Sequence, residues 1–279
     1  MIKNKVIDDF GDEWERFDFL EETNLLSLQK QFDKYFLCVP RQVIRDKNLI
    51  IADFGAGTGR WSHFLREYAS KLYVIEPSTK AFGVASRRFT ANQKITLLQN
   101  TIENNEVPNA SLDLAVCLGV LHHIENTEAA LSSIANKIKP GGSLLCYIYY
   151  ALENKSLLYK IIWRISDFGR ELISRLPKWL KFLVCEFIAL GIYWPFAKIS
   201  KVLSIVGIEH ENFPLHHYEN LSYQVMRNDA LDRFGTSIEK RYSQIQIQKM
   251  LELCNFEIST LVFSSQEPHW TFWVQKKTS

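Results

Sequence analysis

The chain has 279 residues, of which 47% are hydrophobic and 23% charged, a composition typical of one large globular domain or one domain with an insertion. Its formal net charge of +2 is too small to favour a nucleic-acid partner. The five cysteines form no C-x-x-C pair, which favours reduced thiols over a metal site. MIKNKVIDDF lacks a signal peptide's apolar core, so we expect a cytoplasmic protein.

The first regular element is a helix in the mixed polar and aromatic segment 13–36, indicated by apolar spacing at Leu25, Leu28, Phe32 and Phe36. From Leu49 onward, strands alternate with helices. Strands are predicted at 49–54, 71–77, 95–99, 112–119 and 143–150, and helices at 58–69, 79–89 and 126–138. This alternation predicts βαβ units, with a mostly parallel sheet and helices on both faces.

The alternation stops after Tyr150 and resumes near Ser243, where SQIQ resembles a capping box before a helix. Two further strands are expected at 256–263 and 269–275. The intervening segment, 151–242, is much longer than an αβ loop of about 2–6 residues. We therefore expect it to have its own structure.

The loop after the first strand, in IADFGAGTGRW, has glycines at alternate positions 55, 57 and 59. The dinucleotide pattern G-x-G-x-x-G requires glycine where Arg60 stands, and the G-K-[ST] ending of a phosphate loop is absent. The better match is D-x-G-x-G-x-G with an acidic residue that ends the next strand. Glu76 can accept hydrogen bonds from two ribose hydroxyls, and Asp53 can attract a cation. A positively charged nucleoside without phosphate, S-adenosylmethionine, suits such a site.

With these residues the sequence resembles the class I S-adenosylmethionine-dependent methyltransferases. The matching segments are ADFGAGTGR, YVIEPS, ASLDLAVCLGVLHHIEN and IKPGGSLL, in the family's order and spacing. The resemblance implies a Rossmann-like, doubly wound seven-stranded sheet of order 3-2-1-4-5-7-6 with strand 7 antiparallel. It divides the chain into an N-terminal helical cap (1–48), a donor-binding core (49–150), a helical insertion or substrate lid (151–242) and a C-terminal completion of the sheet (243–279).

The resemblance also implies the residues that bind the donor. These are Asp53, Gly55, Ala56, Gly57 and Gly59 at the methionine end, Glu76 and Pro77 at the ribose, Asn100, Thr101 and Ile102 at the adenine, and Leu118 and Gly119 at the methyl group. Many members have an aspartate where this chain has Asn100; the asparagine can still reach the adenine edge.

Transfer to a hydroxyl needs a general base and no metal. The candidates are two histidine pairs, His122 with His123 after the fourth strand and His216 with His217 in the insertion. The alternatives are a structural role for the first pair and a surface loop for the second.

The insertion is expected to determine the substrate. FLVCEFIALGIYWPFA at 182–197 is apolar but shorter than the ~20 residues that span a bilayer, and it contains Glu186 and Pro195. We therefore expect no transmembrane helix. A helical lid, a membrane-surface or lipid-substrate element with a basic rim, and a dimer interface remain open, so the chain would be a monomer or homodimer.

Further substrate contacts are predicted on both sides of the core. The residues are Trp14, Phe17, Tyr35, Tyr218, Arg227 and Arg241. Ordinary packing of the aromatic residues and surface ion pairs of the arginines are the alternatives.

Together these features predict methylation of a small molecule, at oxygen rather than at carbon or nitrogen, on a natural-product, sugar or lipid-like intermediate. LGVLHH stands where amino-methylating relatives have N/D-P-P-Y/F. The alternatives are a membrane-docked quinone or polyprenyl C-methyltransferase and a non-catalytic S-adenosylmethionine-binding partner subunit.

Overall fold

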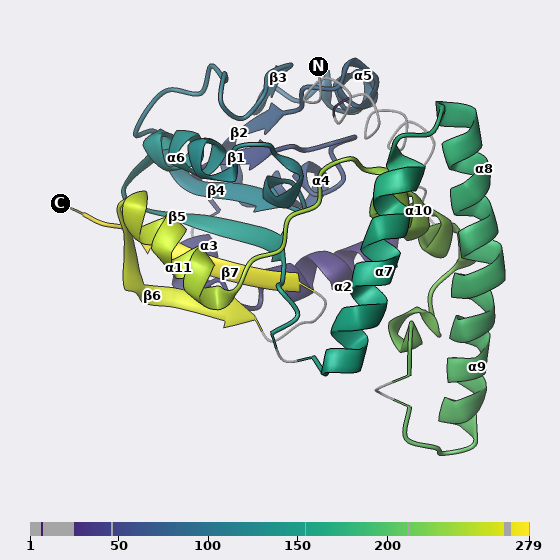
Figure 1. Cartoon of the computed structure of the whole chain (residues 1–279). Helices are drawn as coiled ribbons and strands as arrows, with labels where there is room; N and C mark the ends of the chain where they lie inside the picture. The colour runs from purple at the N-terminus through teal and green to yellow at the C-terminus, as the bar shows by residue number, and fades with distance from the viewer. Residues whose placement is uncertain are drawn as a thin grey trace.

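A computed structural model describes Ile7 and residues 25–45, 47–153, 155–210, 213–264 and 269–278. It shows a sheet with helices on both faces, and a further layer of helices beyond one end of the strands (Figure 1). Trp14 and Phe17, predicted to contact the substrate, lie outside the described residues.

The sheet has seven strands in the order β3-β2-β1-β4-β5-β7-β6, as predicted. The strands are β1 (Leu49–Phe54), β2 (Ala69–Ile75), β3 (Ile95–Leu98), β4 (Leu112–Leu118), β5 (Ile138–Tyr149), β6 (Phe256–Ser264) and β7 (His269–Lys276). β1 to β5 are parallel, and β7 is antiparallel to both its neighbours. β5 starts at Ile138, before the predicted start of this strand at 143, so residues 140–142 lie within the strand.

Helices connect the strands and cover both faces of the sheet. They are α2 (Leu25–Phe36), α3 (Arg41–Ile44), α4 (Ser62–Leu65), α5 (Thr79–Phe89), the short η1 (Leu121–His123), α6 (Thr127–Lys137) and α11 (Gln244–Leu253). The helix predicted at 58–69 is shorter in the structure. Ala69 cannot belong to it, because Ala69 is the first residue of β2 and pairs with Leu49. Ser243 and Gln246 form the predicted capping box of α11.

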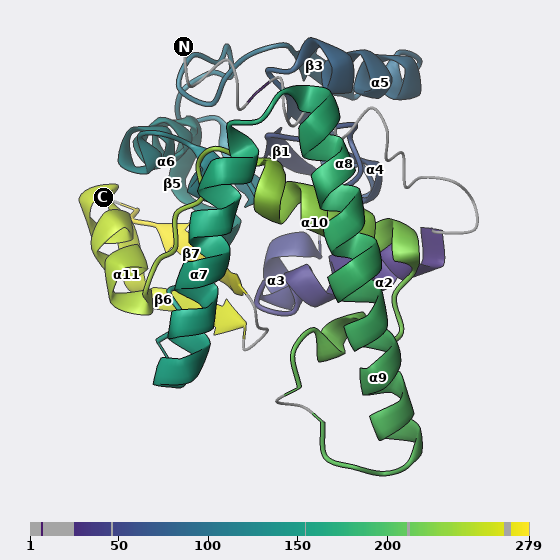
Figure 2. The ribbon, with the colours of Figure 1, turned by 45° about the vertical axis from the view of Figure 1, so that its right-hand side comes forward.

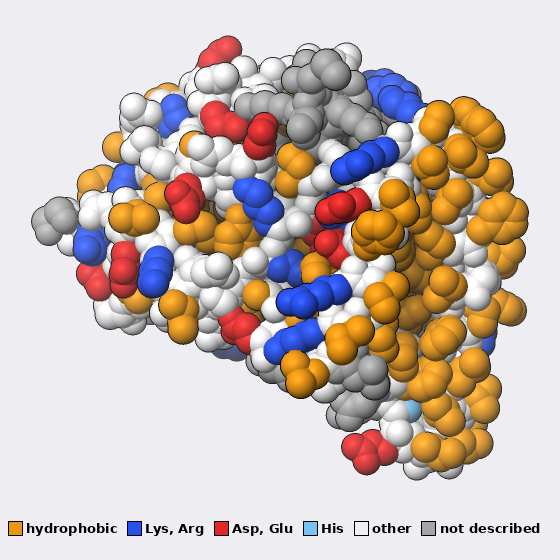
Figure 3. Space-filling model, viewed as in Figure 1, with side chains coloured by type: hydrophobic (Ala, Val, Ile, Leu, Met, Phe, Trp, Pro, Cys, Tyr) orange, Lys and Arg blue, Asp and Glu red, His pale blue; other side chains and the backbone are white. Residues whose placement is uncertain are grey.

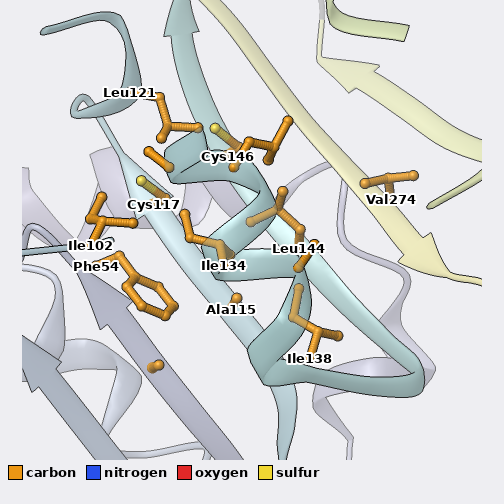
Figure 4. Close-up of a cluster of buried hydrophobic side chains, with 14 of the residues drawn as sticks. Phe54, Ile102, Ala115, Cys117, Leu121, Ile134, Ile138, Leu144, Cys146 and Val274 are labelled. Atoms are coloured by element: carbon orange, nitrogen blue, oxygen red, sulfur yellow. The ribbon is translucent and has the colours of Figure 1, made fainter. Parts of the chain in front are cut away.

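Side chains alternate between two apolar cores along the buried strands. Leu144 and Cys146 of β5 belong to the core shown in Figure 4, whereas Leu145 belongs to the core on the other face. The second core includes Phe32 of α2, which has no exposed surface. This period of two is what a sheet covered on both faces requires, and it fixes which β5 side chains face α2.

The insertion is helical and contains α7 (Leu157–Ser174), α8 (Lys178–Ile188), the π-helical η2 (Ala189–Tyr193), α9 (Trp194–Ile205), the short η3 (His216–Tyr218) and α10 (Tyr223–Gly235). α7 and α8 lie side by side in front of α10 (Figure 2), and both contact it. α10 in turn lies between them and the sheet.

α8, η2 and α9 form one continuous helix from Lys178 to Ile205, and Pro195 lies inside it. The π-helical η2 directly precedes α9, at the point where a proline in a helix interior leaves a backbone carbonyl without its N–H partner. The helix has 28 residues and 22% of its most apolar window is buried. By length and composition this one helix in the described part of the chain could cross a membrane, so the prediction that the apolar segment is too short to span is wrong.

Candidate donor and acceptor site

The glycine loop follows β1 at the carboxyl end of the sheet. Its three glycines have positive φ angles of 73°, 58° and 81°, a region that residues with a Cβ rarely adopt. A Cβ on Gly55 would lie 2.5 Å from the Val120 side chain, and one on Gly59 would lie 2.3 Å from Phe89. Both the backbone and the packing therefore require glycine at these two positions.

Two buried carboxyls flank this loop. Asp53, at the end of β1, accepts a hydrogen bond from Ser62 Oγ at 2.5 Å. Glu76 follows β2 and accepts from the backbone N–H groups of Gly57 at 2.9 Å and Ser78 at 2.8 Å. Burial raises the pKa of Asp53 to about 6 and that of Glu76 to about 7. The predicted ribose-binding carboxylate is thus held against the glycine loop itself.

The predicted adenine residues continue from β3, which pairs with β2. Asn100 is half-buried and Ile102 is buried. Thr101 Oγ1 is buried, and no described residue forms a hydrogen bond to it. Buried hydroxyls are normally hydrogen-bonded, so this atom fits a site whose polar partner is a bound molecule. Pro77 is half-buried beside Glu76.

Ala56 and the end of β4 complete the predicted donor site. The N–H groups of Gly55 and Ala56 both donate to the Ile75 carbonyl, at 2.9 and 3.0 Å. Leu118 pairs with Tyr147 of β5, and Gly119, with a φ of 82°, donates from its N–H to the Tyr147 carbonyl at 3.2 Å. The glycine loop, the end of β2 and the end of β4 therefore meet at the carboxyl end of the parallel strands.

An aromatic cluster adjoins Gly119. The Tyr147 ring lies 3.6 Å from the position of a Cβ on Gly119, and its centroid is 4.1 Å from that of His269. Tyr35 stacks on Tyr147 at 5.7 Å and meets Trp61 edge-on at 5.3 Å. The predicted residue Tyr35 thus lies beside the predicted methyl position.

His122 and His123, which follow β4, lie in the same region. The His122 ring stacks on Tyr149 at 3.9 Å, and no described residue forms a hydrogen bond to its buried Nδ1. Burial, together with the neighbouring cationic groups, holds the pKa of His122 well below its usual value. His123 Nδ1 lies 2.7 Å from the Ile238 carbonyl, and its Nε2 lies 3.6 Å from Asp232 Oδ1.

α10 closes this region from the insertion. Tyr149 donates its hydroxyl to Asp232 Oδ2 at 2.6 Å, which ties the end of β5 to α10. Arg241 lies with its guanidinium 5.1 Å from the Tyr149 ring centroid and donates to Glu239 at 2.9 Å. Tyr147 and Tyr149 were not predicted as site residues from the sequence. They stand at alternate positions near the carboxyl end of β5 and so share one face, which is a signal that could have identified them.

The second histidine pair lies apart from these groups. η3 contacts α9, and Tyr218 belongs to a small apolar core formed within the insertion. Tyr218 donates to Asp229 Oδ2 at 2.9 Å, and the His217 ring packs on Tyr218 at 4.0 Å. Burial and the neighbouring His216 lower the pKa of His217 to about 4.

Arg227, another predicted substrate contact, forms a half-exposed ion pair with Glu186 of α8 at 2.7 Å. The structure therefore brings Tyr35, Arg241 and the first histidine pair to the carboxyl edge of the sheet. It places Arg227 and the second histidine pair within the insertion.

The fold is Rossmann-like, with the two buried carboxyls at the carboxyl end of its parallel strands. A family described as "Methyltransferase domain" matches residues 52–146. An uncharacterized methyltransferase of Mycobacterium tuberculosis is 34% identical over 94 residues, which are 34% of this chain and 47% of that protein. The mitochondrial ubiquinone biosynthesis O-methyltransferase of Schizosaccharomyces pombe is 26% identical over 112 residues, 37% of this chain and 40% of that protein.

A solved structure extends the likeness in fold over nearly the whole chain. The magnesium protoporphyrin IX methyltransferase of Synechocystis, solved with bound S-adenosylhomocysteine, has a TM-score of 0.51 and 16% identity, and it covers 95% of this chain and 92% of its own. The chain spans about half the length, or less, of the curated relatives it matches. Residues 52–146 match the methyltransferase-domain family, and the seven-stranded sheet has the strand order expected from the resemblance to class I S-adenosylmethionine-dependent methyltransferases.

Proposed function

We propose that the protein binds S-adenosylmethionine in the glycine-loop site and transfers the methyl group to a hydroxyl of a small-molecule acceptor. The observation that carries this proposal is the pair Asp53 and Glu76, two buried carboxyls on adjacent parallel strands with the glycine loop between them. Burying a carboxylate costs free energy unless it is paired. A ligand with a cationic centre and ribose hydroxyls supplies both kinds of partner.

The residues fit that ligand without any phosphate group. Glu76 already accepts two backbone N–H groups, and each of its oxygens retains a lone pair for a ribose hydroxyl. Thr101 Oγ1 lacks a partner where the adenine would lie. Asp53 and the loop from Gly55 to Gly59 would hold the amino-acid end. When bound, this cofactor supplies an electrophilic methyl group on a sulfonium.

The acceptor would lie beyond Gly119, against the aromatic cluster of Tyr147, Tyr35 and His269. These rings would give an acceptor site apolar walls, which would exclude water and suit a ring or other flat apolar group. Positioning of this kind can contribute about 7–11 kcal/mol to a displacement reaction. A relative named as an O-methyltransferase supports oxygen as the acceptor atom.

His122 is the group best suited to take the hydroxyl proton. Its lowered pKa keeps the imidazole neutral at physiological pH, stacking on Tyr149 fixes the ring, and Nδ1 lacks a hydrogen-bond partner among the described residues. In the transfer that a bound donor would support, His122 would accept the proton that the acceptor hydroxyl loses. His123 is less available, since its Nδ1 lies 2.7 Å from the Ile238 carbonyl and its Nε2 lies 3.6 Å from the Asp232 carboxylate.

Incubation with donor labelled in its methyl group tests the proposal on a panel of phenols, quinols and aliphatic alcohols. We expect a methyl ether from one of these classes, and donor binding by calorimetry. Donor binding without turnover on any class would support the non-catalytic subunit instead. Methylation at carbon or nitrogen would contradict the assignment of oxygen, and absence of donor binding would overturn the site.

A further inference from the structure

The insertion has an unusual concentration of apolar side chains on its outer surface. Of the 24 exposed large hydrophobic side chains among the described residues, 18 lie between Leu157 and Ile208. In Figure 3 they cover the side of the molecule formed by α8 and α9 and continue onto α7. Soluble monomers rarely expose contiguous apolar patches of this kind without an interaction partner.

On α7 the exposed residues form one stripe. Ile161, Ile165, Phe168 and Leu172 recur at spacings of three and four and are 54–68% exposed. The opposite side of α7 faces the rest of the protein, where Arg170 is 5% exposed and donates to the Thr236 carbonyl, and Ile173 packs against an apolar core. The stripe is therefore the outer face of a helix whose inner face is already packed.

The long helix has the same arrangement. Trp179, Leu183, Phe187 and Leu190 are 47–69% exposed, whereas Lys181, Cys185, Ala189, Tyr193 and Ala197 are buried against the rest of the protein. Glu186 is held by Tyr223 and Arg227 of α10 at 2.8 and 2.7 Å. Because one side is tied to the folded domain along its length, lipid cannot surround this helix while it stays docked.

Charge distinguishes between the possible occupants of this surface. Residues 155–206 contain nine of the 33 Lys and Arg residues but only three of the 31 Asp and Glu residues of the chain. The exposed cations border the two stripes, and they are Arg164, Arg175, Lys178, Lys198 and Lys201. A two-fold dimer through this surface would bring like charges together, whereas an anionic bilayer complements both the cations and the apolar stripes.

The composition of the stripes agrees with this choice. Trp179 and Trp194 stand in the exposed surface, the second with Lys198 at 5.8 Å from its ring. Tryptophan is enriched where a protein meets the boundary between headgroups and acyl chains. We propose that the protein docks peripherally on anionic phospholipid bilayers, with α7 and the helix Lys178–Ile205 lying in the plane of the interface. This proposal is independent of the methylation chemistry.

The test uses the full chain and vesicles of phosphatidylcholine with or without phosphatidylglycerol. We expect co-sedimentation with the anionic vesicles that weakens at high salt. The double variant Leu183→Ser with Phe187→Ser should lower the partition coefficient by at least about 100-fold. Lys198→Glu with Lys201→Glu should lower it by at least about tenfold. Leu253→Ser, at another strongly exposed position, is the control and should bind like wild type.

Brominated lipid provides a second readout that does not depend on folding yield. It should quench the tryptophan fluorescence of the wild type, and the quenching should be weaker in the Trp179→Phe variant. Trp273 is buried, so the Trp273→Phe variant should be quenched as strongly as the wild type. A monodisperse wild-type protein that does not bind anionic vesicles would overturn the proposal. A wild type that binds no lipid but forms a dimer, which is lost in the Leu183→Ser, Phe187→Ser variant, would also overturn it. Retention of the protein in membranes after alkaline extraction would indicate a spanning helix and would overturn it as well.

Discussion

Replacing Glu76 with glutamine separates donor binding from folding. The carboxylate accepts hydrogen bonds from Gly57 and Ser78 and has lone pairs left for two ribose hydroxyls. Charged hydrogen bonds contribute about 1.5–3 kcal/mol each. The amide nitrogen of glutamine cannot accept a hydrogen bond, so we expect donor affinity to fall by at least about 100-fold.

Stability should change much less, because two effects oppose each other. Raising the pKa of Glu76 from 4.5 to about 7 by burial corresponds to about 3 kcal/mol, which the uncharged variant regains above neutral pH. One backbone N–H facing the new amide group loses its acceptor, at a cost of about 1–3 kcal/mol. We therefore expect a free energy of unfolding within about 2 kcal/mol of wild type.

Calorimetric titration with S-adenosylhomocysteine and urea unfolding measure the two quantities on the same preparations. The exposed Glu252→Gln is the matched control and should leave both unchanged. Wild-type affinity in a folded Glu76→Gln protein would refute the assignment of the ribose site, and so the reasoning from paired carboxyls.

Three more predictions concern the same region. The two buried carboxyls beside the loop hold their protons more tightly in the folded protein than in the unfolded chain, with pKa values of about 6 and 7. Their contribution to the free energy of unfolding should therefore fall as the pH rises from about 4 to about 7. Over the same range the affinity for the cationic donor should rise, and an affinity that does not change with pH would contradict this. His122→Ala should lower kcat by about 10²–10⁴-fold with donor affinity unchanged, whereas His217→Ala should leave kcat near wild type, and the reverse would move the base to the insertion. Gly59→Ala, with its Cβ against Phe89, should lower the urea midpoint, whereas Gly169→Ala, in α7 with nothing within 4 Å of its Cβ, should raise stability by about 0.5–1 kcal/mol; equal effects would contradict the packing argument.

The sheet was predictable because its signals are local or close in sequence. The glycine turn after 49–54, the acidic end of β2 and the cap at Ser243 each depend on a few adjacent residues, and the structure contains all of them. The strand order came from the resemblance. Periodicity cannot provide that order, since it says which faces are buried but not which strands are neighbours.

The insertion and the acceptor side were not predictable to the same degree. Pro195 counted against a spanning helix, but the helix continues past it after a π-helical turn. Tyr147 and Tyr149 looked like ordinary strand residues, because their roles arise from contacts with His122 and with Asp232 of α10, which lies 83 residues from Tyr149. Contacts between distant segments leave no periodic signal in the sequence.

The structure of the protein in complex with S-adenosylhomocysteine tests the central claim most directly. We predict both ribose hydroxyls within hydrogen-bond distance of the Glu76 carboxylate and the amino-acid end beside Asp53. A nucleoside bound elsewhere, or a nicotinamide dinucleotide with its pyrophosphate on the glycine loop, would contradict it.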